Sequence, residues 1–146
     1  MRYQITVVAL ALAGAGVVSS CSLNMGGQGS IEPIAIPTTT VTPHASEIVF
    51  AELRHDGVCL YVITIVGDRP GRSILPIWPK GFSAKIGPRT LQLYSGLGQE
   101  NNAFVVDAER MELHGEYVDT APPDATVPPD CTKYPLFLVG QVFNRS

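Results

Sequence analysis

Charged residues are scarce in this chain of 146 residues, where they make up 16% of the sequence. An ordinary globular protein has roughly 25%. The formal net charge is only −3, from 10 Lys and Arg against 13 Asp and Glu, so neither sign dominates. This balance excludes an acidic or basic tail protein and a nucleic-acid binder that works through bulk positive charge. The length allows one domain around a single core.

Long apolar runs and helical periodicity are also missing. The longest apolar stretch, Ile5–Val18, is shorter than the roughly 20 residues that a spanning helix needs, which excludes a multi-helix membrane protein. It follows a single basic residue, Arg2, and it has the length of a signal-peptide hydrophobic region. We therefore expect residues 1–20 to be a signal peptide, with a retained transmembrane helix as the alternative.

The end of this stretch carries a more specific pattern. Residues Val18–Cys21 (VSSC) resemble the bacterial lipobox, in which an aliphatic residue and two small residues precede a cysteine. The resemblance implies cleavage after Ser20, a diacylglycerol on the Cys21 sulfur and an acyl chain such as palmitate on its amine. It places the mature protein on the extracytoplasmic face of the cell membrane, held by lipid. Ser22 is not the Asp of an inner-membrane retention signal, which leaves outer-membrane sorting open. The alternative is an ordinary secretory signal whose Cys21 later forms a disulfide.

Cysteine is rare as well, with three residues in the whole chain. If Cys21 carries lipid, Cys59 and Cys131 remain as an even pair in an oxidising compartment, where a disulfide is expected. Such a bridge would close a loop of about 73 residues and stabilise the fold by about 4 kcal/mol. Two buried free thiols are the alternative. A metal site is not expected, because the two cysteines lack the paired spacing of zinc ligands.

The rest of the chain divides by composition. Residues 22–45 are rich in Gly, Pro, Thr and Ser and carry one charge, so we expect 21–45 to be the lipidated N-terminus and a flexible tether. Residues 46–146 contain short β-branched and apolar runs separated by Gly, Pro or Asn, which favours an all-β domain. A small barrel or a sandwich fits this pattern. We favour a partly open, OB-like barrel of about six strands with one disulfide. The strands are expected at Glu47–His55, Val58–Val66, Ser73–Trp78, Thr90–Tyr94, Ala103–Val106, Arg110–Val118 and Leu136–Phe143.

Residues with chemical potential are few in this domain. No GxSxG surrounds a serine, and no two histidines form a metal-binding pair. Glu112, His114 and Glu116 alternate along one expected strand and would share a face, opposite Met111, Leu113 and Tyr117. That row is a weak candidate for a divalent cation or for acid–base chemistry. The simpler interpretation is the solvated face of a half-buried strand.

A second candidate is the corner formed by Trp78-Pro79-Lys80-Gly81-Phe82. Proline fixes its own φ and Gly81 permits a turn, so the segment presents two large aromatics in a defined shape. If exposed, Trp78 and Phe82 could stack on a sugar ring or a peptide, and Lys80 could attract an anionic partner. If buried, they would close one end of the barrel.

A fainter resemblance covers most of residues 47–143. The Gly57–Leu60 stretch, the Trp78–Phe82 corner, Gly115 and the late Cys131 look like small extracytoplasmic bacterial domains of uncharacterised function. Those domains keep a Gly-x-Cys-Leu strand and a Trp-Pro-x-Gly corner. The resemblance implies a β fold and a disulfide, and it implies no activity.

The sequence therefore predicts a lipid-anchored binding or envelope-assembly module that is not an enzyme and needs no cofactor. Its expected contacts are the membrane, through the N-terminal lipid, and an envelope protein or cell-wall glycan, with no nucleic acid. Two alternatives stay open. One is a structural or immunity-type role in protein interactions, and the other is a metal-assisted hydrolase that uses Glu112 and His114.

Overall fold

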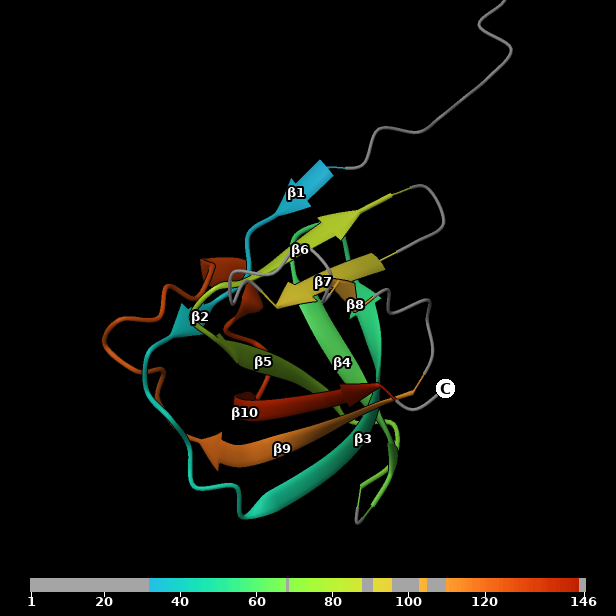
Figure 1. The fold of residues 1–146 in the computed structure, drawn as a ribbon, viewed down its shortest axis with the longest axis vertical. Coiled ribbons are helices and arrows are strands. Elements are labelled where there is room, and N and C mark those ends of the chain that lie inside the picture. The colour runs from blue at the N-terminus through green and yellow to red at the C-terminus, as the bar shows by residue number, and fades with distance from the viewer. Residues whose placement is uncertain (1–31, 68, 88–90, 96–102, 105–109, 145–146) are drawn as a thin grey trace, which may run out of the picture.

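A computed structural model of the chain describes residues 32–67, 69–87, 91–95, 103–104 and 110–144 (Figure 1). The predicted signal peptide, the predicted lipid attachment site Cys21 and the first part of the predicted tether lie outside these residues. No helix in the described ranges has the length and apolar character to cross a bilayer. The elements are β1 (Glu32–Ile34), β2 (Thr38–Thr39), β3 (Glu47–His55), β4 (Leu60–Val66), β5 (Ser73–Pro79), β6 (Phe82–Ile86), β7 (Leu91–Ser95), β8 (Ala103–Phe104), β9 (Met111–Val118), the short 3-10 helix η1 (Pro129–Cys131) and β10 (Leu136–Asn144).

The core of the fold is a closed ring of strands. A six-stranded sheet runs in the order β10-β9-β3-β4-β5-β2, and β10 also pairs with β5, which joins the two sides of the sheet into a barrel. The neighbouring strands of this ring are antiparallel except at the seam, where β5 and β10 run parallel with Leu75 opposite Leu136. The predicted all-β, barrel-like fold is confirmed.

Alternation along the strands explains why the ring closes around a core. Successive side chains of a strand point to opposite faces. One face of β3 carries the buried residues Val49, Ala51 and Leu53, and the same period buries Leu60 and Val62 of β4. These side chains fill the barrel together with residues of β5, β9 and β10.

One end of the barrel is capped by a second sheet. Its strand order is β1-β6-β7-β8, and Figure 1 shows β1 and β6 at the top of the molecule. Trp78, near the end of β5, is completely buried at this end and stacks on Phe82 with 5.8 Å between ring centroids. Ala84 and Leu93 of the second sheet are buried in the same core. The capping sheet therefore seals this end with apolar side chains.

The predicted tether is wrong for residues 32–45. β1 pairs with β6, β2 pairs with the end of β5, and Thr39 is buried. Asp124 accepts hydrogen bonds from the hydroxyls of Thr39 and Thr40 and from the Thr40 amide. These bonds lower the pKa of Asp124 to about 2, the Thr39 hydroxyl contributing most. The domain therefore includes Glu32 onward. Strands of three and two residues are too short to show a period in the sequence, which is why composition alone indicated a tether.

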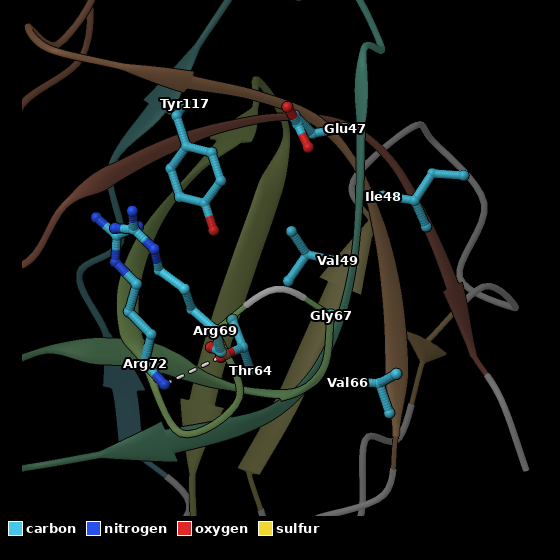
Figure 2. Close-up of a pocket in the computed structure, with 9 residues that line it drawn as sticks. All are labelled: Glu47, Ile48, Val49, Thr64, Val66, Gly67, Arg69, Arg72 and Tyr117. Carbon is cyan, nitrogen blue, oxygen red and sulfur yellow. Dashed lines mark hydrogen bonds between the residues drawn. The ribbon is translucent and has the colours of Figure 1, made fainter.

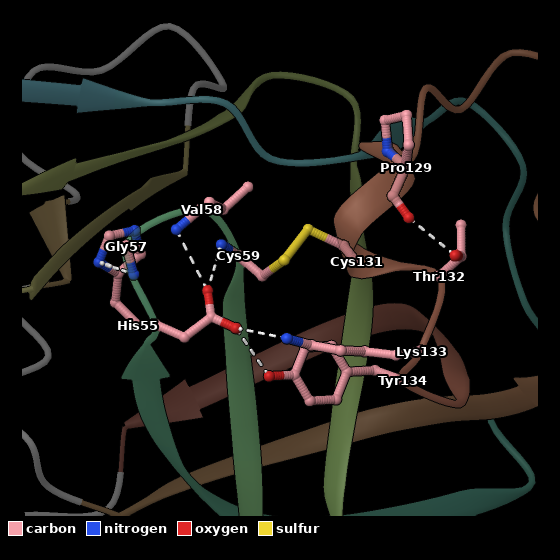
Figure 3. The surroundings of a disulfide bond; sticks show 10 residues. His55, Gly57, Val58, Cys59, Pro129, Cys131, Thr132, Lys133 and Tyr134 are labelled. Carbon is pink, nitrogen blue, oxygen red and sulfur yellow. Dashed lines mark hydrogen bonds and ion pairs between the residues drawn. A yellow bond between two sulfur atoms is a disulfide. The ribbon is translucent and has the colours of Figure 1, made fainter.

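The predicted disulfide is confirmed between Cys59 and Cys131, with 5.6 Å between the Cα atoms (Figure 3). Both residues are buried in a small cluster with Leu75 on the outer side of the barrel. Asp56 lies beside this bridge and accepts hydrogen bonds from the amides of Val58 and Cys59. Its carboxylate also accepts from the side chains that follow Cys131, the Lys133 ammonium at 3.1 Å and the Tyr134 hydroxyl at 2.8 Å.

These bonds keep the pKa of Asp56 well below its usual range, the largest contribution coming from the Cys59 amide and the next from Tyr134. Tyr134 also stacks on Tyr61 of β4, with 4.8 Å between the ring centroids. The covalent bridge and the carboxylate thus join the same two segments. Together they hold the approach to β10 against the start of β4.

Candidate ligand-binding site

The opposite end of the barrel is open. Because neighbouring strands are antiparallel except at the seam, β3, β5 and β10 begin and β4 and β9 end at this end. A cavity of about 450 Å³ lies there, and we call it the mouth. Its walls come from the start of β3, the end of β4, the β4–β5 turn and the end of β9 (Figure 2). Ligand pockets commonly measure about 300–1,000 Å³ and often occupy the mouths of β-barrels.

The same alternation that fills the core supplies the walls of the mouth. Glu47 shares a face of β3 with the buried Val49, and Tyr117 shares a face of β9 with Met111 and Leu113. Tyr117 nevertheless remains 40% exposed. Its ring packs edge-on against the buried Phe137, with 5.0 Å between centroids, and its hydroxyl points into the cavity (Figure 2). Tyr117 is thus on the inner face of its strand and still exposed, as expected for a residue at an open end of the barrel.

Two arginines reach the mouth from the turn between β4 and β5. The side chain of Thr64, which is 6% exposed, donates to the Arg69 carbonyl at 2.6 Å and accepts from the Arg72 amide at 3.0 Å. The Thr64 carbonyl accepts a further hydrogen bond from the amide of Gly71, a residue with a positive φ of 81°. A buried threonine therefore fixes the backbone from which both arginines extend.

The electrostatics of the mouth are dominated by these two guanidinium groups. The Arg72 Cζ atom lies 5.2 Å from the centre of the Tyr117 ring, a cation–π contact. Within the part of the chain that the structure describes, no carboxylate lies within ion-pair distance of Arg69 or Arg72. Glu47 lines the same cavity. On the rim, the apolar side chains of Ile48 and Val66 are 54% and 61% exposed. The mouth thus combines cationic, apolar and hydrogen-bonding groups.

The predicted row of Glu112, His114 and Glu116 does not form a metal site. Glu112 Oε1 lies 2.5 Å from His114 Nε2, whereas Glu116 accepts a hydrogen bond from the backbone amide of His44. No group of three ligating side chains occurs among the described residues. The expected solvated face is also wrong for Glu112, which is 5% exposed. Two phenylalanines lie opposite Glu112 on the neighbouring strands, Phe50 of β3 and Phe143 of β10.

The predicted aromatic contact site is wrong in its main residue. Trp78 has no exposed surface, so it cannot stack on a ligand, and Phe82 is half-buried against the same core. Lys80 is exposed, and its backbone amide donates to the Thr39 carbonyl at 2.7 Å. The alternative interpretation, in which the corner closes one end of the barrel, is confirmed.

Sequence analysis did not identify Arg69, Arg72 or Tyr117 as site residues. Arg69 and Arg72 lie in the break between two expected strands, and Tyr117 lies on the strand face opposite Glu112, His114 and Glu116. One signal was available for Arg72, which stands two residues before the buried Ile74 and so continues the inward period of β5. No protein-family model, curated protein or solved structure matches this chain.

Proposed function

We propose that this protein is a membrane-anchored binding module of the bacterial cell envelope and that it binds its ligand in the mouth of the barrel. The observation that carries the proposal is the difference between the two barrel ends. One end is sealed by Trp78 and the second sheet, whereas the other holds a cavity of about 450 Å³ with two arginines. The lipobox-like Val18–Cys21 supports the anchor, because acyl chains hold a protein to a bilayer without a spanning helix.

The position of the mouth suits such a role. The chain enters the described domain at β1, at the top of Figure 1, whereas β3 starts at the bottom. An anchor on the N-terminal side of β1 therefore attaches to the domain far from the mouth. The mouth then faces away from the attachment point and stays accessible from the surrounding compartment.

The anchor is tested by metabolic labelling with a fatty-acid probe in the native host. The full chain should take up label and sediment with membranes, and Cys21→Ala should do neither. Ser22→Ala is the matched control and should keep the label. Equal labelling of Cys21→Ala and the parent chain would refute the lipid anchor.

The binding site is tested by photo-crosslinking in living cells. A photoreactive residue at Glu47, an exposed position whose side chain faces the mouth, should give an adduct that mass spectrometry detects on the purified chain. The same residue at Lys85, an exposed position of β6 in the capping sheet, is the control and should not give this adduct. No adduct at Glu47, or the same adducts at both positions, would contradict a ligand site at the mouth.

A further inference from the structure

We propose that the mouth recognises an oxyanion group, a phosphate or a carboxylate, held by the guanidinium groups of Arg69 and Arg72. This inference rests on the proposed function, because it names the chemistry of the ligand for the same cavity. It follows from three properties of the mouth, which are two cations that form no ion pair with a described residue, a fixed backbone, and the apolar and aromatic groups in the wall.

The first property is that two arginines face the cavity and form no ion pair with a carboxylate among the residues that the structure describes. A guanidinium group offers a planar set of N–H donors that matches the oxygens of a carboxylate or a phosphate. Arg69 and Arg72 line one cavity, and no carboxylate among the residues that the structure describes forms an ion pair with either of them. Two positive groups on one concave surface raise the local potential, although the whole chain carries a net charge of −3. An anion that enters would therefore gain charge-assisted hydrogen bonds.

The second property is preorganisation. Thr64 is buried and bonds to the backbone of both arginines, so the turn is held in place without a ligand. The contact of Arg72 with the Tyr117 ring further restricts that side chain. In Figure 2 the side chains of Arg69 and Arg72 extend toward the side of the cavity where Tyr117 lies. Binding to groups that are already positioned loses less conformational entropy.

The third property is the surface around the cations. Ile48 and Val66 border the mouth with side chains directed away from the arginines, whereas Val49 lies in the wall and the Tyr117 ring and hydroxyl face the cavity (Figure 2). These groups suit a ligand whose anionic group is attached to an apolar or aromatic body. Glu47, on the β3 side of the same cavity, would repel a second anionic group at the far end of the ligand. The favoured ligand is therefore anionic at one end only.

A phosphate of this kind could belong to a soluble compound or to a phospholipid headgroup. The soluble source is favoured, because β1 and the N-terminal side of the domain lie at the end opposite the start of β3 (Figure 1). A domain attached at that end turns the mouth away from its own membrane. The two sources are separate arms of the test.

The test uses the full chain, purified in a nonionic detergent and labelled with ¹⁵N at arginine. Titration with phenyl phosphate should shift the side-chain Nε–Hε resonances of Arg69 and Arg72 in a saturable manner. Calorimetry should show that Arg69→Gln and Arg72→Gln each weaken the binding about tenfold or more, the loss expected for a charge-assisted hydrogen bond. Arg110→Gln is the matched control. Arg110 is an exposed arginine just before β9, at the other end of that strand from Tyr117, and its loss should change the dissociation constant by less than about twofold.

Two outcomes would overturn the proposal. One is the absence of saturable shifts at Arg69 and Arg72. The other is an equal weakening by Arg69→Gln and Arg110→Gln, which would show attraction by overall charge alone. In both cases a persistent adduct at Glu47 would leave the mouth as a ligand site with different chemistry, whereas loss of that adduct as well would remove the proposed function itself.

The second arm identifies the source of the phosphate. The chain is placed in nanodiscs of phosphatidylcholine or of phosphatidylglycerol, and phenyl phosphate is titrated into each. Similar affinity in both supports the soluble source. Arginine resonances that are already shifted in phosphatidylglycerol, with phenyl phosphate competing, support the oxyanion site and assign it to a headgroup.

Discussion

Replacing Trp78 with alanine should lower the free energy of unfolding by about 3–5 kcal/mol, the usual cost of removing a large aromatic side chain from a core. The value applies here because Trp78 has no exposed surface and packs on Phe82 between the barrel and its capping sheet. Small domains are stable by only about 5–15 kcal/mol in total. The variant should therefore be close to unfolding at 37 °C rather than folded and unable to bind.

A milder replacement separates packing from hydrogen bonding. Trp78 Nε1 is buried and has no hydrogen-bond partner among the described residues. An unsatisfied buried donor costs about 1–3 kcal/mol, and Trp78→Phe removes that donor together with part of the ring. We therefore expect Trp78→Phe to be more stable than Trp78→Ala. The difference between their free energies of unfolding should be about 2 kcal/mol or more.

The assay is urea unfolding followed by far-UV circular dichroism, because Trp78 is the only tryptophan of the chain and its fluorescence disappears in both variants. In the parent chain that fluorescence serves as a separate check. Its emission should be blue-shifted and insensitive to iodide until the domain unfolds. Ready quenching in the folded state, or an unchanged urea midpoint in Trp78→Ala, would refute the burial of this residue and the sealed barrel end.

Three other perturbations test the remaining contacts. Replacing Cys59 and Cys131 by alanine removes a bridge with a sequence separation of 72 and should lower the free energy of unfolding in urea by about 4 kcal/mol. An unchanged urea midpoint would contradict the stabilising role of the disulfide. Hydrogen bonds from the threonine that ends β2 and from the next residue lower the pKa of Asp124 to about 2. The Asp124 carboxylate therefore contributes fully to stability above about pH 4, and this contribution is lost as the pH falls through about 2. Asp124→Asn should flatten that part of the urea-midpoint profile, whereas Asp119→Asn, in the same loop, should not. A Cβ on Gly115 would lie 1.9 Å from a backbone oxygen of β10. Gly115→Ala should therefore lower the free energy of thermal unfolding by about 3 kcal/mol or more. A fully stable variant would show that β9 and β10 separate easily.

The strands of the barrel could be predicted where the apolar pattern is long enough. The expected Glu47–His55 coincides with β3, and the expected Ser73–Trp78 with all but the last residue of β5. The expected Val58–Val66 includes β4, and its nearly continuous apolar character is typical of a strand buried on both faces. In the structure the outward residues of β4 are only half-buried, because apolar composition does not distinguish a two-sided from a one-sided environment. β6 was missed although Phe82–Ile86 alternates apolar and polar residues.

The disulfide could be predicted from the sequence, but the mouth could not. Cysteine parity depends only on counting, so Cys59 and Cys131 were paired correctly. The mouth depends on which strand ends meet, and that follows from the parallel pairing of β10 with β5. Arg72 and Tyr117 are far apart in the sequence and come together only through this closure. Likewise, Glu112 is buried between two neighbouring strands, β3 and β10, and its own strand does not encode which strands pair with it.

The seam between β5 and β10 also sets when the domain can finish folding. A chain is synthesised from its N-terminus, so β5 exists before its last partner, β10, which begins only at Leu136. Until then the part of this edge of β5 that β2 does not pair with exposes unpaired backbone groups, the kind of edge that joins strands of other chains. Parallel pairing between distant segments is also slow. Nascent and C-terminally truncated chains should therefore depend on chaperones and aggregate when these are scarce, so the nine residues of β10 protect the nascent domain as well as complete it.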